Sequence, residues 1–294
     1  MRILVLGTAA GGGVPQWNCR CAVCALARAG DTRVRARTQC GFAASADGAD
    51  WMLVNASPDL RQQLLSTPHL APRSGNRSSP VRAVVLTNGE LDHVAGLLSM
   101  RESQRFALYA TAETHAALDD NPVFDALARD VVNRIVLSPE AEVEICGLKV
   151  IPLKVPGKEP LYLEGQCDTE ATTIGLHVRH GLKTCLIVPN CAAVTQELRS
   201  ACEGADFLFF DGTTFTDDEM IRLGLSQKSA GRMGHVPMTG PHGSLNAFHG
   251  LKIGRRIYVH INNSNHVLIE GSFEHEQARA AGWEIAHDGM EFVT

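Results

Sequence analysis

Short apolar runs, separated by polar stretches that contain Gly and Pro, recur along the whole chain and predict a protein rich in buried strands. Asp47-Gly48 and His180-Gly181 mark tight turns between neighbouring runs. The expected strands are residues 2–6, 39–45, 51–55, 82–86, 106–110, 173–178, 184–188, 207–210, 256–261 and 283–287, with a hairpin over 143–155 that turns near Cys146-Gly147.

Helices are expected to alternate with these strands. One begins at Ser57 as N-cap, with Pro58 in the first helical position, where its missing N–H costs nothing. The others are expected over 92–100, 111–118, 192–202 and 273–281. Residues 71–80, 156–170 and 211–244 lack periodicity, and a loop as long as 211–244 within a compact domain is often functional.

The order of the elements favours an α/β fold. Strand-rich and helical segments recur in both halves of the chain, without an obvious internal period and without a flexible linker. Two mixed sheets packed together, with helices on the outer faces, would bury all of these apolar runs. We therefore expect an αββα sandwich that forms a single domain over residues 1–294.

Composition and charge favour a soluble protein and exclude some classes of partner. The chain is 45% hydrophobic and 20% charged, as in soluble globular proteins. Its net charge of −5 argues against a nucleic-acid partner, which needs a basic surface. The N-terminal apolar run is too short for a signal peptide, and no stretch approaches the roughly 20 apolar residues that span a bilayer. We expect a cytoplasmic protein without membrane insertion. An odd number of cysteines, nine, argues against a disulfide framework.

A Gly-rich loop over residues 7–15 follows the first predicted strand. It matches neither a dinucleotide-binding fingerprint nor a P-loop, and Pro15 blocks immediate entry into a helix. Tight turning and close backbone approach explain its glycines better than nucleotide binding does.

Cys19, Cys21 and Cys24 lie within six residues, inside a Cys-rich loop at about 15–28. Three thiolates can converge on one cation, and a fourth ligand would complete a tetrahedron. This pattern predicts a closed, structural zinc site. The alternative is a merely exposed Cys cluster. The fourth ligand is open: His260 and His266 are candidates, as is another His brought close by the fold.

Carboxylates and imidazoles gather at three further places. Glu90, Asp92 and His93 lie where the strand 82–86 gives way to a helix, so they either share a metal ion or merely cap that helix. Asp211 follows the apolar strand 207–210. His260 ends another strand and leads into a polar loop, which is more typical of a site than of a core. Further histidines occur late in the chain at His235, His242, His249 and His266.

These motifs together resemble the metallo-β-lactamase superfamily, and the C-x-C-x-x-C loop resembles that of its phosphodiesterase branch, which carries a structural zinc there. Residues 86–97 lie over the H-x-H-x-D-H metal motif, but Asn88 and Glu90 replace its first two His. Only Asp92 and His93 match, while His260 matches the final metal His. A further metal His is missing near residues 155–158, and Pro189-Asn190 stands where a bridging Asp is usual.

The altered pattern resembles one family closely, pyrroloquinoline quinone (PQQ) biosynthesis protein B. The motifs are V-P-Q-W-N-C-x-C-x-x-C, T-N-G-E-x-D-H, the F-D-G-T-x-x-x-D-x-E stretch at 210–219 and V-H-I-N-N-S-N at 259–265. The resemblance runs from Met1 to the C-terminus. It implies a metallo-β-lactamase fold with one metal held by Asp92, His93 and His260, with the carboxylates of Glu90 and Asp211 as further candidates. The alternative is a site that binds no metal and serves only as scaffold.

The resemblance also implies a function. Few His among several carboxylates suit Fe²⁺ better than Zn²⁺ or Mn²⁺, and the implied reaction is oxygen-dependent hydroxylation of the tyrosine ring in a Glu-Tyr precursor of PQQ. Glu90 would be a ligand or a proton acceptor, and Arg or Lys side chains would hold the carboxylates of this dipeptide or small-molecule precursor.

The resemblance leaves two other functions open. One is a non-enzymatic carrier that aids transport of PQQ or its precursor to the periplasm, and the other is a zinc-dependent phosphodiesterase. Other PQQ-biosynthesis proteins are expected partners, and whether the chain forms a homodimer stays open.

Overall fold

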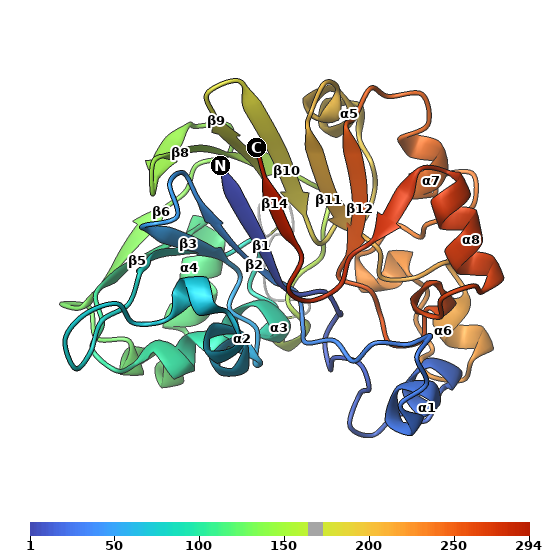
Figure 1. Cartoon of the computed structure of the whole chain (residues 1–294), viewed down its shortest axis with the longest axis horizontal. Coiled ribbons are helices and arrows are strands. Elements are labelled where there is room, and N and C mark those ends of the chain that lie inside the picture. Colours follow the sequence, from blue (N-terminus) through green and yellow to red (C-terminus); the bar gives the residue numbers. More distant parts are fainter. Residues whose placement is uncertain (164–172) are drawn as a thin grey trace.

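Two seven-stranded sheets packed face to face form the centre of the structure, a computed structural model that describes residues 1–163 and 173–294 (Figure 1). The first sheet has the order β14-β1-β2-β3-β4-β5-β6, in which β3 to β6 run parallel and the other pairs antiparallel. Its strands are β1 Arg2–Gly7, β2 Gly41–Ser45, β3 Trp51–Val54, β4 Val81–Val85, β5 Phe106–Ala110, β6 Val132–Val136 and β14 Glu291–Val293.

The second sheet has the order β13-β12-β11-β10-β9-β8-β7, with β10 to β13 parallel. Its strands are β7 Val143–Ile145, β8 Leu148–Lys154, β9 Ile174–His180, β10 Lys183–Val188, β11 Phe207–Asp211, β12 Arg255–Val259 and β13 Trp283–Ile285. Apart from β14, which returns to pair with β1, each half of the chain therefore supplies one sheet.

Alternate residues of each strand face different layers, so both faces of the sheets are apolar. Ile3 and Val5 point into the core between the sheets, where Phe42 meets Phe209 at 5.2 Å between ring centroids. Leu4 and Leu6 point outward, against the helices of the first sheet. The two sheets thus share one core, and each has a second core beneath its helices.

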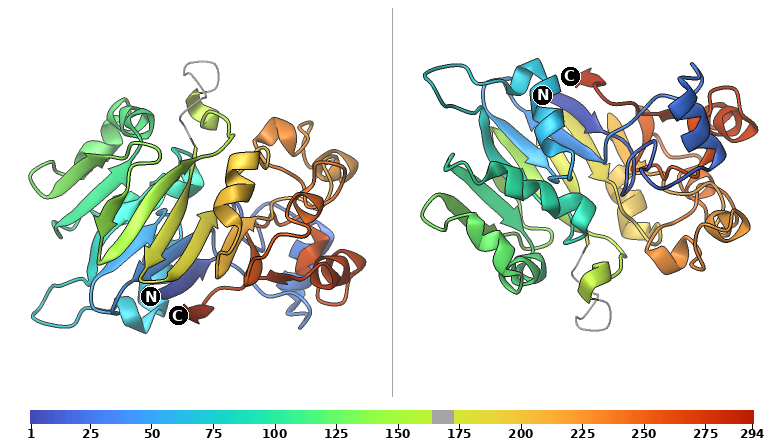
Figure 2. Two further views of the ribbon diagram at one scale, coloured as in Figure 1. Left: turned by 90° about the horizontal axis from the view of Figure 1, so that it is seen from above. Right: turned by 90° about the horizontal axis from the view of Figure 1, so that it is seen from below.

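Helices cover the outer faces, as Figures 1 and 2 show. α2 and α4 pack on the first sheet through Leu60 and Leu118. α5 and α8 pack on the second through Leu198 and Ala278. The helices are α1 Ala22–Ala29, α2 Leu60–Ser66, α3 Leu91–Val94, α4 Ala112–Asp119, α5 Gln196–Cys202, α6 Glu219–Arg222, α7 Ser244–Ala247 and α8 Phe273–Ala280.

The expected αββα architecture is confirmed, and the predicted strands differ from those observed by a few residues at their ends. β6, β14 and α1 were not predicted. The predicted helix over 92–100 is a single α-turn, α3, followed by the 3₁₀ helix Ala95–Met100. The expected loop 211–244 contains α6 and the 3₁₀ helix Gly231–Met233. Of the irregular segment 156–170, residues 164–170 lie outside the described residues.

The predicted start of α2 is wrong by two residues. Asp59, not Ser57, occupies the N-cap position, and its side chain makes no cap hydrogen bond. The Ser57 hydroxyl instead donates to Gln63 Oε1 at 3.3 Å. Over the described ranges, no helix has the length and apolar character needed to cross a bilayer.

Candidate metal centre

The carboxyl ends of four strands meet at one edge of the sandwich, the place where α/β sheets usually bind ligands. β4 leads through Thr87-Asn88 to Asp92 and His93 at the start of α3. β10 is followed by Asn190, β11 ends at Asp211, and β12 is followed by His260. Side chains from both sheets therefore converge, although their positions in the sequence are far apart.

Asp92, His93 and His260 place one potential ligand atom each within 4.8 Å of the others. The two imidazoles lie edge to face with centroids 5.5 Å apart, and His260 Nε2 lies 3.0 Å from Asp92 Oδ2. All three of the residues predicted to hold the active-site metal thus meet in one cluster.

Asn88 fixes the orientation of His93. Its Oδ1 accepts the backbone N–H of Glu90 at 3.0 Å and lies 2.7 Å from His93 Nδ1. Because this oxygen can only accept, Nδ1 carries the proton and Nε2 carries the lone pair. Nε2 is buried and has no hydrogen-bond partner among the described residues. An unpaired buried imidazole nitrogen is costly unless a cation fills that place, so the residues fit a bound metal.

His260 is held on both sides. Its Nδ1 lies 3.0 Å from Thr213 Oγ1, which in turn donates to Asp211 Oδ1 at 2.7 Å. The backbone of His260 has φ 51°, in the left-handed region that costs a non-Gly residue about 1–3 kcal/mol. Such backbone strain persists only where the surrounding structure stabilises it. Here the imidazole of the strained residue lies against Asp92.

A second cluster joins the first through His260. Asp211, His235 and His260 also bring ligand atoms within 4.8 Å of one another. Asp211 Oδ2 accepts from Cys191 N at 3.0 Å and lies 2.6 Å from His235 Nδ1. Asp211 therefore lies where it was predicted. His235 was named among the late histidines but was not selected as a site residue, because nothing in the local sequence distinguishes it from His242 or His249.

Burial and charge set the protonation of these groups. Burial lowers the pKa of His93 to about 4, so this ring is neutral at pH 7 and keeps its lone pair. Burial acts against ionisation of Asp92, but the nearby imidazoles of His93 and His260 outweigh it and hold the pKa of Asp92 below its usual range. The same balance lowers the pKa of Asp211, with the neighbouring His235 as the largest effect that opposes burial.

Glu90 lies apart from both clusters. Its Oε1 pairs with Lys158 Nζ at 2.7 Å, and Oε2 accepts the backbone N–H of Leu161 at 3.4 Å. Asn88 is the other departure from the superfamily motif, and its side chain accepts hydrogen bonds from His93 Nδ1 and Glu90 N. Glu90 thus belongs to the wall of the site, where its ion pair ties the residues after β8 to the metal loop.

A cavity of about 590 Å³ opens over the clusters, within the range of small-molecule sites. Apolar groups form much of its wall, and Lys158 and Lys228 bring two cationic groups to it. The Oδ1 atom of Asn190, buried and without a hydrogen-bond partner in the described part of the chain, also faces this region. The apolar lining residues are Pro58, Leu91, Leu161, Met220 and Met233.

The Gly-rich loop passes along the cavity through Gly11 and Gly12. Gly12 and Gly13 have φ 94° and 69°, and a Cβ on Gly7 would lie 2.1 Å from the Gln39 carbonyl oxygen. Tight turning and close backbone approach therefore account for these glycines, as expected from the sequence.

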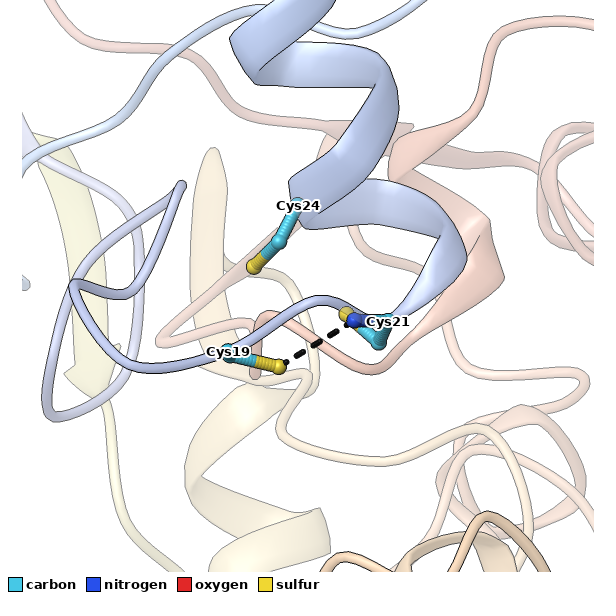
Figure 3. A group of neighbouring side chains, drawn as sticks. All are labelled: Cys19, Cys21 and Cys24. Carbon is cyan, nitrogen blue, oxygen red and sulfur yellow. Dashed lines mark hydrogen bonds between the residues drawn. The ribbon is translucent and has the colours of Figure 1, made fainter.

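Cys19, Cys21 and Cys24 form a separate cluster at the start of α1, where their sulfurs lie within 4.8 Å of one another (Figure 3). Burial raises the pKa of Cys21 to about 12; a hydrogen bond with the Cys24 backbone acts against this, whereas the Cys19 and Cys24 thiols add to it. Partial burial also opposes ionisation of Cys19, but hydrogen bonds from Cys21 and its neighbours leave the pKa of Cys19 lowered. Three adjacent thiolates need a compensating cation, so this trio fits a metal such as zinc.

Neither histidine proposed as the fourth ligand joins the cysteines. His260 belongs to the cluster with Asp92, and His266 Nδ1 lies 3.8 Å from Glu274 Oε1. No fourth His, Cys, Asp or Glu in the described ranges completes this group. Asn263 is the polar neighbour: its Nδ2 lies 3.3 Å from Cys24 Sγ, and its carbonyl accepts from Cys21 Sγ at 3.2 Å.

Known proteins resemble this chain over nearly its whole length. The model of the β-lactamase superfamily domain matches residues 50–261. Coenzyme PQQ synthesis protein B of Methylorubrum extorquens is 51% identical over 296 residues, covering 99% of both chains. The same-named protein of Xanthomonas euvesicatoria is 48% identical and covers both chains fully.

Solved structures give the same relationship. The crystal structure of Zn²⁺-bound PqqB from Methylobacterium extorquens has a TM-score of 0.97 and 50% identity, with full coverage of both chains. A diphosphatase of the PhnP family has a TM-score of 0.70 at 23% identity, covering 99% of this chain and 97% of its own, and shares the fold.

Proposed function

Since the chain belongs to the coenzyme PQQ synthesis protein B family of the β-lactamase superfamily, we propose that it acts in PQQ biosynthesis as an iron- and oxygen-dependent hydroxylase. Its substrate is the tyrosine ring of a Glu-Tyr precursor. The observation that carries this proposal is the convergence of two buried imidazoles and one carboxylate, with the lone pair of His93 Nε2 unpaired. Two His and one carboxylate are typical of ferrous oxygenases.

Asp92, His93 and His260 would hold the ferrous ion, which when bound would activate dioxygen for insertion of one oxygen atom into the ring. The second oxygen atom leaves as water, so each turnover also needs two electrons and two protons from an external reductant. Zn²⁺ and Mn²⁺ are the less favoured metals. The zinc of the Methylobacterium relative is compatible with the same ligands or with the cysteine cluster.

The other residues of the site would position substrate and move protons. Asp211 fixes Nδ1 of His235, so Nε2 is the atom through which His235 would exchange a proton at the cavity wall. The apolar wall suits an aromatic ring, and Lys158 and Lys228 would bind the precursor carboxylates. Glu90 would hold Lys158 in place rather than bind the metal.

The ligand set counts against a zinc-dependent phosphodiesterase. Such an enzyme uses two metals to generate hydroxide and to neutralise the phosphate. Here Asn88 is hydrogen-bonded to His93 and to the backbone, and Asn190 offers a neutral amide where a bridging carboxylate is usual. The resemblance to the PhnP-family diphosphatase lies in the fold.

The test uses protein purified without oxygen, loaded with ferrous iron and given Glu-Tyr, ascorbate and dioxygen. We expect oxygen consumption matched by a product 16 mass units heavier, the mass of one inserted oxygen. His93→Ala should abolish both iron binding and oxygen consumption, whereas His249→Ala, an exposed histidine outside both clusters, should change neither.

Two results would overturn the proposal. One is iron-loaded protein that consumes no oxygen with Glu-Tyr and leaves it unmodified. The other is tight binding of finished PQQ by protein that never turns over, which would favour the carrier. A phosphodiester assay with Zn²⁺ or Mn²⁺ tests the hydrolase, and we expect no activity.

We further propose that Cys19, Cys21 and Cys24 hold a structural zinc ion. The distances between their sulfurs support this, as does the need of adjacent thiolates for a cation. The ion would join α1 to the loop that follows β12, because Asn263 contacts two of the sulfurs.

A further inference from the structure

A second cavity, of about 320 Å³, lies on the outer side of the second sheet, away from the metal clusters. It forms between the segment 31–39, helix α8 and the strand β13, and helix α8 lies at the right of Figure 1. Its lining residues are Arg33, Arg35, Arg37, Leu268, Glu270, His275, Arg279, Trp283, Glu284, Ile285 and His287. None of these lines the cavity over the metal centre.

Arg33, Arg35 and Arg37 come from one short segment, in which Arg33 lies in a turn and Arg37 in a β-bridge, and all three line the cavity. Val34, between the first two, is buried against the core. Arg37 pairs with Val14 in an antiparallel bridge, which fixes the direction of the segment. This segment therefore brings three arginines to the same cavity.

Helix α8 adds to this charge from across the cavity. His275 and Arg279 are four residues apart, and such residues lie on the same face of a helix. Four arginines thus line one small cavity in a chain whose net charge is −5. Like charges repel at this spacing, and Arg35 lowers the pKa of Arg37 in this way, after the larger effect of burial.

The carboxylates nearby neutralise the cluster only in part. Glu284 lines the cavity but forms its ion pair with Arg255, 2.7 Å at each oxygen, and Arg255 is not part of the cavity. Asp31 pairs with Arg33 at 2.8 Å, and Glu276 pairs with Arg279 at 3.7 Å. Within the described ranges, Arg35 makes no ion pair.

Arg37 is the buried member of the cluster. Its side chain is 9% exposed and donates through Nη1 to Thr8 Oγ1 and to the carbonyl of Ala286, but its Nε is buried without a partner among the described residues. Asp288 lies close enough to raise the pKa of Arg37 against burial. Both oxygens of Asp288, however, accept from Thr8 and Thr38.

We propose that this cavity is a binding site for a small polyanion, with phosphate or carboxylate groups as the part that the arginines recognise. Guanidinium groups match both groups in shape through paired N–H donors. The volume suits a small molecule, and the indole of Trp283 gives the cavity an apolar floor. A bound anion would pair with Arg35, which makes no ion pair within the described ranges.

The same segment connects this site with the metal cavity. Gln39, two residues beyond Arg37, lines that cavity, and its Oε1 accepts the backbone N–H of Gly12 at 3.0 Å. An anion that orders Arg35 and Arg37 would therefore also order one wall of the active site. Its binding, however, is independent of the function proposed for the metal centre.

Calorimetric titration of the full chain with inorganic phosphate and with tricarballylate tests the proposal and separates the two anion chemistries. We expect saturable binding of at least one of them at constant ionic strength. Arg35→Ala, an exposed residue whose loss leaves the fold intact, should weaken it at least tenfold, and Arg37→Ala more strongly. Arg77→Ala, in the exposed loop 71–80, should leave it unchanged.

Both probes are also metal ligands, so the titrations are repeated on His93→Ala, which should bind the anion as the wild type does. Absence of saturable binding, or equal binding by Arg35→Ala and wild type, would overturn the proposal. Loss of binding in His93→Ala would assign the anion to the metal centre instead. If only an acidic peptide such as oligoglutamate binds, the cavity is part of a protein interface and the small-anion site is refuted.

Discussion

Replacing Asn88 by Ala tests how the metal centre is assembled, because Asn88 is hydrogen-bonded to His93, one of the proposed metal ligands. Its Oδ1 accepts from His93 Nδ1 at 2.7 Å and from Glu90 N at 3.0 Å. The substitution removes the acceptor of both hydrogen bonds. His93 then loses the hydrogen bond that fixes its tautomer, and the ring becomes free to present a protonated Nε2 to the site.

The size of the effect follows from these contacts. Loss of a hydrogen-bond partner behind a metal-binding His typically costs about 10–100-fold in metal affinity. Thr87 Oγ1 lies 3.3 Å from His93 Nδ1 and would replace part of the lost bond. We therefore expect a loss of about tenfold, at the lower end of that range. The unpaired backbone N–H of Glu90 should cost about 1–3 kcal/mol in stability.

Anaerobic titration with Fe²⁺, and with Co²⁺ as a spectroscopic substitute, measures the affinity. Asn88→Asp keeps an acceptor for both donors, so it should bind metal at least as well as the wild type. Asn121→Ala, remote from both clusters, is the matched control. Equal affinity in Asn88→Ala and wild type would show that Asn88 does not orient His93, and that the unpaired Nε2 has another explanation.

Three further predictions address other parts of the molecule. Cys21→Ser should remove about one zinc ion per chain by elemental analysis, whereas Cys146→Ser should keep it; unchanged zinc in the first variant would refute the structural site. Glu90→Gln should change Fe²⁺ affinity less than about twofold, because Glu90 pairs with Lys158, and a large loss would make Glu90 a ligand. Burial lowers the pKa of His115, so the unfolded chain binds its proton at higher pH than the folded chain does, and stability should fall as the pH drops below about 6.5. Urea unfolding at several pH values should show a smaller fall for His115→Gln, and identical slopes would contradict this.

Most strands could be predicted from the sequence because buried strands are continuous apolar runs. β6 was not predicted because Asn133 and Arg134 interrupt its run of apolar residues. β14 is only three residues long and owes its form to pairing with β1, a contact between the two ends of the chain. Short strands of this kind depend on tertiary contacts that no local pattern contains.

The site was predictable to the extent that its residues follow strands. Asp211 ends β11, His260 directly follows β12, and Asp92 and His93 lie at the start of α3 after β4; the fold brings the four together as expected. His235 lies in a loop without periodicity, and only the hydrogen bond to Asp211 distinguishes it. Glu90 was expected at the metal because it neighbours Asp92 in sequence, but successive residues at the start of a helix point in different directions, and Lys158 holds Glu90 at the wall.

The division of the chain into two sheets has a consequence for reassembly. Asp92 and His93 come from the first half of the chain, and His260 lies 168 residues after Asp92 in the second. A chain cut between β6 and β7 would leave each fragment with an incomplete set of metal-binding groups. Metal uptake by the mixed fragments would then report that the two sheets have found each other, and added metal would in turn hold the fragments together.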